Sequence, residues 1–116
     1  MHFTTSYKFG DVVLVGFPFT DQERSKQRPA VVISSTAYAV HRPDIIALAI
    51  TSRVRPAGAD AFLVEDWEQA GLLKLSAFKP LITSLEKEMV VRNMGSLSPR
   101  DQATLMRLLQ TTLGPP

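Results

Sequence analysis

Residues 10–34 read GDVVLVGFPFTDQERSKQRPAVVIS, and this stretch decides the fold. Its first apolar run, residues 12–17, is short and rich in valine, and Pro18 ends it. A wholly polar segment, residues 21–27, leads to a second apolar run at residues 29–34. We expect these runs to be two antiparallel strands with a long connection. Long connections on a rigid sheet are favoured places for function.

The rest of the chain continues this pattern of short strands. Residues 45–51 form the most apolar run and are expected to be a central strand. Further strands are predicted at residues 61–64, 72–75, 77–83 and 89–92, and Pro80 predicts an edge, a bulge or a break in the sheet. Residues 36–44 are expected to be irregular, and residues 65–70 to form a helical turn closed by Gly71.

The C-terminal segment carries the signals of a helix over residues 98–113. Ser98 suits the N-cap, Pro99 the first helical position and Asp101 the first turn. One stripe of this helix holds Leu105, Leu108, Leu109 and Leu113, which is most simply explained by core packing. Residues 1–7 are expected to be a flexible tail. The pattern as a whole predicts a mainly β fold, a small barrel or curled sheet with one terminal helix.

Composition narrows the classes of protein. The 116 residues suit a single domain, residues 1–116, and the absence of cysteine excludes disulfides and thiolate-bound metals. The two histidines, His2 and His41, are poor candidates for a catalytic pair because His2 lies in the expected tail. The longest apolar run is far shorter than the roughly 20 residues of a membrane span, and the N-terminus lacks the apolar core of a signal peptide. We therefore expect a cytoplasmic protein that does not engage a membrane.

Positive charge is concentrated in the middle of the chain. Residues 24–58 hold six cations, Arg24, Lys26, Arg28, Arg42, Arg53 and Arg55, against the single acid Asp44, which gives +5 within a chain of net charge +2. Such asymmetry suits a polyanionic partner, although a solvated basic face would show the same pattern.

Residues whose side chains could take part in catalysis lie at the ends of strands. Arg28 precedes the second strand, and Thr51 and Ser52 end the third. If these strands pair antiparallel, Arg28 and Thr51 meet.

RNA carries its own nucleophile, the 2′-hydroxyl, so an enzyme has to orient that group and stabilise the charged phosphate. The planar fork of arginine matches two phosphate oxygens, and a threonine hydroxyl can bind a third. An arginine stays protonated at neutral pH, so we assign Arg28 to charge stabilisation and leave its part in proton transfer open. Surface arginines and strand-end threonines are also common without any function.

Other familiar sites are missing. The sequence has no phosphate-binding glycine loop, no HExxH and no GxSxG. The acidic cluster Asp60, Glu65, Asp66 and Glu68 surrounds Trp67 and is better explained as a solvated loop than as a metal site. We expect neither a metal nor a cofactor.

Several blocks, in order, resemble the MazF/PemK family of toxins. They are residues 10–15 (GDVVLV), 17–21 (FPFTD), 28–34 (RPAVVIS), 49–52 (AITS), 84–89 (SLEKEM) and 95–99 (GSLSP). Each block alone is weak, but together they cover residues 7–114, nearly the whole chain.

The resemblance implies an SH3-like, partly open barrel of the CcdB/MazF/PemK type with a C-terminal helix. It implies a homodimeric toxin of a type II toxin–antitoxin system that cleaves single-stranded RNA at specific sequences without a metal and usually leaves a cyclic phosphate. The partners would be messenger RNA and a cognate antitoxin. The family's catalytic arginine falls on Arg28 and its catalytic threonine on Thr51, while Thr20, Lys26, Ser52 and Arg53 are the expected RNA contacts.

The chain departs from the family at three places. Gly16 stands where many members carry an acid, which would remove a polar partner near the site. The loop at residues 21–27 lacks the glycine that many relatives have, and Pro80 is expected to reshape the part that selects bases. Two other functions therefore stay open: a CcdB-like toxin that binds gyrase without nuclease activity, and a degenerate regulatory dimer that binds nucleic acid.

Overall fold

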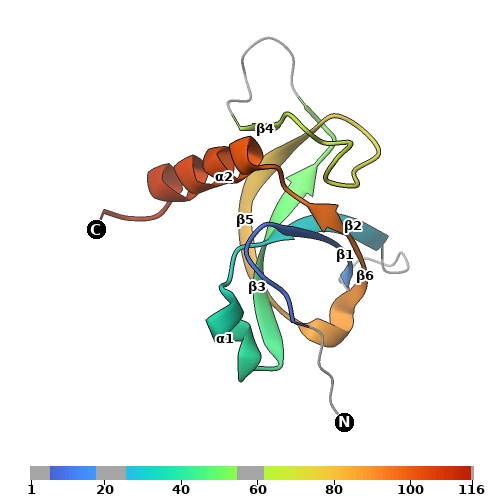
Figure 1. Cartoon of the computed structure of the whole chain (residues 1–116), viewed down its shortest axis with the longest axis vertical. Helices are drawn as coiled ribbons and strands as arrows, with labels where there is room; N and C mark the ends of the chain where they lie inside the picture. The colour runs from blue at the N-terminus through green and yellow to red at the C-terminus, as the bar shows by residue number, and fades with distance from the viewer. Residues whose placement is uncertain (1–5, 18–25, 55–61, 116) are drawn as a thin grey trace.

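The computed structural model describes residues 6–17, 26–54 and 62–115, and it shows a six-stranded antiparallel sheet that curls on itself (Figure 1). The elements are β1 (Asp11–Phe17), β2 (Lys26–Val32), α1 (Thr36–Val40), β3 (Asp44–Thr51), β4 (Leu63–Val64), β5 (Ser76–Glu86), the 3-10 turn η1 (Lys87–Met89), β6 (Val90–Ser96) and α2 (Pro99–Thr112). The strand order is β4-β5-β3-β2-β1-β6. This curled, mainly β sheet with a C-terminal helix confirms the expected fold class.

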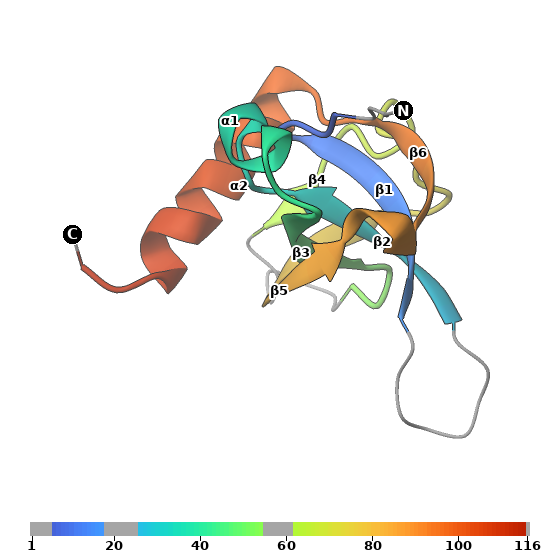
Figure 2. The same cartoon turned by 90° about the horizontal axis from the view of Figure 1, so that it is seen from below.

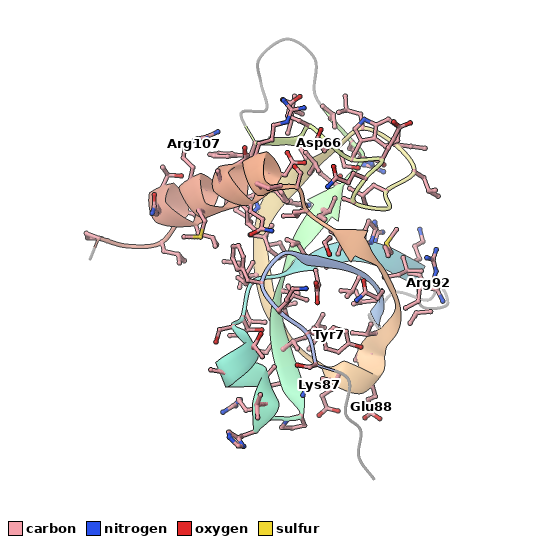
Figure 3. All side chains as sticks on the ribbon, in the orientation of Figure 1. Tyr7, Asp66, Lys87, Glu88, Arg92 and Arg107 are labelled. Atoms are coloured by element: carbon pink, nitrogen blue, oxygen red, sulfur yellow. The ribbon has the colours of Figure 1, made fainter. Side chains whose placement is uncertain are left out.

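The alternation of side chains along the strands gives the sheet two buried faces. On the helix face, alternate residues such as Val12, Val31 and Leu48 pack with Leu105 and Leu108 of α2. On the opposite face, which we call the inner face, the intervening residues pack with Tyr7 and Ala39. Tyr7 lies inside the curl of the sheet in Figure 3. The inner-face residues of the strands are Val13, Val15, Ala30, Val32, Ile45, Ala47 and Leu85.

The first two strands pair as expected from the sequence. β1 and β2 are antiparallel, with Val12 opposite Val31 and Phe17 opposite Lys26. β2 begins at Lys26, so the paired region extends into the segment expected to be loop. The paired ends of β1 and β2 extend beyond the other strands (Figure 2).

Three predicted elements differ from the structure. Residues 36–44 are not wholly irregular, because Ser35 caps the short helix α1 by accepting a hydrogen bond of 3.0 Å from the N–H of Tyr38. Residues 72–75 form no strand. β5 is one continuous strand of 11 residues rather than an interrupted pair.

Pro80 lies in an irregularity of β5. The register passes from Leu48 opposite Ile82 to Ile50 opposite Phe78, so residues 79–81 face Ala49 alone. Proline has no N–H to donate, and a bulge is a place where no ladder bond is required. Of the three outcomes that Pro80 allowed, the structure has the bulge.

The C-terminal helix follows its sequence signals closely. The Ser98 side chain accepts from the N–H of Asp101, Pro99 is the first helical residue, and α2 ends at Thr112. Leu105 and Leu108 are buried, but the side chain of Leu113 is 55% exposed, so the leucine stripe is only partly core. In the described residues, no helix is long and apolar enough to cross a membrane.

Candidate functional site

Arg28 lies on the inner face of the sheet near the exposed end of β2. It is paired with Val15 of β1, which belongs to the inner-face core, and it precedes Ala30 and Val32 of the same core by two and four positions. Its side chain is exposed. Lys26, two residues earlier, continues the same row and is also exposed. The exposed end of β2 thus carries two cations on one face.

Thr51 ends β3 on that same face. β2 and β3 are antiparallel, and their register pairs Val32 with Ala47 and Ala30 with Ala49. Continued by two residues, this register sets Arg28 across from Thr51. Cross-strand neighbours have Cβ atoms about 5 Å apart, so both side chains can contact one ligand. The structure thus meets the condition on which the sequence argument depended, that these two strands pair antiparallel, and the catalytic role of Arg28 and Thr51 stays a prediction.

The segment after Thr51 turns sharply. The backbone N–H of Arg53 donates a hydrogen bond of 3.0 Å to Oγ1 of Thr51, and the N–H of Val54 donates one of 3.0 Å to the carbonyl of Ser52. Ser52 and Arg53 are exposed and directly follow Thr51. The remaining expected RNA contact, Thr20, lies outside the described residues.

Acids do not neutralise these cations within residues 6–17, 26–54 and 62–115. The ion pairs found there join Lys8 to Asp11, Arg42 to Asp44, and Arg100 to Asp66. Lys26, Arg28 and Arg53 have no ion-pair partner among the described residues.

An apolar groove continues the inner face beside Arg28 and Thr51. Its volume is about 380 Å³, and it is lined by Ala30, Ala47, Leu48, Ala49, Leu81, Thr83, Ser84, Leu85, Glu86 and Met89. In the β2–β3 register, the cross-strand pair Ala30 and Ala49 comes next to the positions of Arg28 and Thr51. A charged end and an apolar groove thus adjoin on one face.

The structure changes the expected effect of Gly16. Val15 of β1 pairs with Arg28. Gly16 is the next residue, so a side chain at this position would lie on the opposite face of β1. A Cβ atom built at Gly16 would lie 4.0 Å from Cγ2 of Val91, which is ordinary contact distance. A side chain at this position would point away from Arg28, so glycine here removes no partner from Arg28.

Asp66, one member of the acidic cluster, has a structural role together with Asp101 that the sequence did not reveal, whereas Asp60 lies outside the described residues. The carboxylate of Asp101 is fully buried and accepts hydrogen bonds of 2.8 Å from the backbone N–H groups of Glu65 and Asp66. Arg100 donates to both carboxylate oxygens of Asp66, and Ser98 donates to one of them. These bonds, Arg100 first, lower the pKa of Asp66. Figure 3 shows Asp66 beside the N-terminal end of α2.

The hydrogen bonds of Asp66 and Asp101 therefore attach the turn at residues 65–71 to α2. Within the described residues, no group of three or more histidine, cysteine or acidic side chains could hold a metal ion. The signal available in the sequence was Asp101 in the first turn of the helix, but its partners lie 35 and 36 residues away in the chain.

Comparison with known proteins gives one family and one fold. The family described as "PemK-like, MazF-like toxin of type II toxin-antitoxin system" matches residues 8–113. An endoribonuclease from a mycobacterial species has 22% identity and a TM-score of 0.72, over 99% of this chain and 98% of that one. The MazE–MazF complex of Deinococcus radiodurans has 20% identity and a TM-score of 0.71, over 92% and 95%.

A third structure, a mycobacterial endoribonuclease in complex with its cognate antitoxin, has 20% identity and a TM-score of 0.67, over 97% of this chain and 98% of that one. At these identities the structures show a shared fold. A comparison with curated protein sequences finds no match.

Proposed function

The chain belongs to the PemK-like, MazF-like toxins of type II toxin–antitoxin systems, and on this premise we propose that it is a metal-independent, sequence-specific endoribonuclease that cuts single-stranded RNA. The observation that supports the proposal is the antiparallel β2–β3 register, in which Ala30 is opposite Ala49. Continued by two residues, that register would bring the Arg28 and Thr51 side chains across from each other on one face. The exposed cations Lys26 and Arg53 beside them suit the phosphates on either side of the cut.

The proposed reaction is attack by the substrate's own 2′-hydroxyl. The 2′-oxygen forms a bond to phosphorus, the bond from phosphorus to the 5′-oxygen breaks, and a 2′,3′-cyclic phosphate and a 5′-hydroxyl result. The 2′-hydroxyl gives up one proton and the leaving 5′-oxygen takes one up. Arg28 stabilises the negative charge that grows on the phosphate oxygens.

Thr51 supplies a second donor to the phosphate. A hydroxyl has one proton and two lone pairs. The N–H of Arg53 uses a lone pair of Oγ1, so the Thr51 proton is available for a phosphate oxygen. The same bond fixes the position of Oγ1, which reduces the reorganisation needed in the transition state.

Three further parts of the proposal come from the family. A cognate antitoxin would block the site, two copies of the chain would form a homodimer, and the toxin would act on messenger RNA in the cytoplasm. Two of the three structural neighbours described above are complexes with an antitoxin.

The test is to incubate the purified protein with a long RNA in EDTA and to map both ends of every fragment. The proposal expects cuts at a defined sequence, cyclic phosphate and 5′-hydroxyl ends, and no cut where the nucleotide before the scissile phosphate is 2′-deoxy. A requirement for magnesium, or cleavage of the 2′-deoxy substrate, would contradict the mechanism. Growth arrest with intact messenger RNA would instead favour a gyrase-binding toxin.

A further inference from the structure

The groove beside Arg28 and Thr51 has an acid at one end. Among the described residues that line it, only Glu86 is charged, and the others are apolar or carry a hydroxyl group. Glu86 is the last residue of β5 and is exposed. The cations Lys26 and Arg28 do not line the groove. Because like charges brought together are costly, the phosphates of an RNA strand are poor occupants of the end that holds Glu86.

The cations near Glu86 in the chain are bound elsewhere. Lys87, the next residue, donates a hydrogen bond of 2.7 Å from Nζ to the carbonyl oxygen of Ala39 in α1. Arg42 forms an ion pair of 3.0 Å with Asp44, which lies directly opposite Glu86 in the β3–β5 register. These two cations therefore bind α1 and Asp44, and Glu86 keeps its negative charge at the surface.

The rest of the groove suits a long aliphatic chain. Ala30 and Ala49 are a cross-strand pair and Ala47 follows on β3, so small side chains form the floor. Leu81 and Met89 line the groove from β5 and from η1. Lysine and arginine have an apolar stem that packs on such a surface and a charged head that stays at its polar edge. The groove thus offers an apolar surface for the stem and a carboxylate for the head.

We propose that the groove binds a lysine or arginine side chain of the antitoxin, with the stem over the alanines and the cation paired with Glu86. This inference rests on the proposed function, which supplies the antitoxin as the partner. The hydroxyl of Thr83 also lines the groove, and its Oγ1 lies 3.4 Å from the carbonyl oxygen of Ser84, a long and therefore weak hydrogen bond. This Oγ1 is able to accept a second hydrogen bond, from the bound side chain.

The contact distinguishes the antitoxin from RNA. Phosphates of the RNA bind the cations Lys26 and Arg28, whereas the basic side chain binds Glu86, a group that repels phosphate. Glu86 therefore contributes to antitoxin binding and not to RNA cleavage. A substitution at Glu86 should separate the two functions.

Small ions test the groove itself, because they need no antitoxin. The probes are n-butylguanidinium, neutral n-butylurea and pentanoate, which share an aliphatic stem and differ in charge. Each is titrated into protein with isotope-labelled methyl groups on alanine and methionine, and the signals of Ala49 and Met89 are followed by NMR. n-Butylguanidinium should shift both signals in the wild type, and Glu86→Gln should weaken its binding at least about threefold.

Glu88→Gln is the matched control for Glu86→Gln. Glu88 is exposed in η1 (Figure 3) but does not line the groove, so this variant should bind n-butylguanidinium as the wild type does. Equal binding of n-butylguanidinium, n-butylurea and pentanoate would overturn the inference. Wild-type binding of n-butylguanidinium by Glu86→Gln, or shifts that leave the signals of Ala49 and Met89 unchanged, would overturn it as well.

The protein encoded beside the gene for this chain is the second probe. Glu86→Arg should weaken its binding at least about tenfold in calorimetry, and replacement of one of its basic residues by glutamate should restore the binding. Glu88→Arg should bind it as the wild type does. Both variants should cleave RNA in EDTA within about threefold of the wild-type rate, because neither residue contacts the phosphates.

Wild-type affinity of Glu86→Arg for this protein would overturn the inference, and so would an equal loss of RNA cleavage, which would place RNA in the groove. Conversion of a dimer to a monomer by Glu86→Arg would also overturn it, because the groove would then hold a second copy of the chain. Failure of the neighbouring protein to bind the wild type would remove the partner and overturn the inference. Absence of RNA cleavage by the wild type would count against the nuclease alone, since both binding measurements remain decisive.

Discussion

The backbone N–H of Arg53 donates a hydrogen bond of 3.0 Å to Oγ1 of Thr51, at the point where β3 ends. This bond holds the hydroxyl of Thr51 in the row of Arg28 and leaves its proton available. We expect Thr51→Val to lower the single-turnover cleavage rate by about 10²-fold, the typical loss of one transition-state donor. Thr51→Ser keeps both the acceptor and the proton and should stay within about tenfold of wild type. Equal rates in the two variants would contradict the role given to the hydroxyl.

The buried carboxylate of Asp101 should matter for stability. Asp101→Ala leaves the N–H groups of Glu65 and Asp66 without their 2.8 Å acceptor. Because unsatisfied buried donors are costly, we expect urea unfolding to show a loss of about 2–4 kcal/mol. Arg100→Ala removes the neighbouring exposed ion pair and should lower the free energy of unfolding much less than Asp101→Ala does. Similar losses in both variants would show that Asp101 has no special role.

Acid should weaken the attachment of the turn to α2. Arg100 and Ser98 lower the pKa of Asp66, so its folded-state pKa is below the value of about 3.9 in the unfolded chain. A carboxyl group with a lowered pKa contributes stability above the unfolded value, and this contribution is lost as the pH falls through the folded value. Asp66→Asn should therefore be less stable than wild type at pH 7, and the difference should shrink below about pH 4. A difference that is the same at pH 7 and pH 3 would contradict this account.

Gly71 should not tolerate a side chain. Its φ is +87°, and a Cβ atom there would lie 2.1 Å from the carbonyl oxygen of Met94. We expect Gly71→Ala to lower the free energy of unfolding by more than about 2 kcal/mol, because the left-handed conformation alone costs a residue with a side chain about 1–2 kcal/mol. Gly16→Ala is the matched control, because its Cβ meets only Val91 at 4.0 Å. It should change stability by no more than about 0.5 kcal/mol and leave cleavage unchanged. A loss of cleavage in Gly16→Ala would show that this position does affect the site.

Local signals predicted much of this fold. The apolar run at residues 45–51 became the central strand β3, and Ser98 with Pro99 marked the start of α2 within one residue. These signals depend on neighbours in the sequence: turn residues, caps and the period of apolar side chains. The sequence indicated that Arg28 and Thr51 would meet if the second and third strands paired antiparallel, and the structure supplied that pairing.

Tertiary contacts account for what the sequence did not predict. Asp101 looked like an ordinary first-turn acid, and its role depends on a turn more than 30 residues away. Residues 72–75 have the composition of a strand but no partner strand within the described residues. The groove arises from three alanines on two strands and from Met89 beyond them, an arrangement that no local pattern marks. The register of β1 with β2 was also needed to show on which face of the sheet Gly16 lies.

The most direct test of the central claim is the single-turnover rate of RNA cleavage in EDTA for Arg28→Ala beside Arg92→Ala. Both changes remove one exposed arginine from a strand next to β1. Arg28 is paired with Val15 on the inner face, whereas Arg92 is paired with Leu14, which alternates to the other face, and lies outside β6 in Figure 3. We predict a loss of about 10²–10³-fold for Arg28→Ala and a change of less than about threefold for Arg92→Ala. Wild-type cleavage by Arg28→Ala, or an equal loss in the two variants, would contradict it.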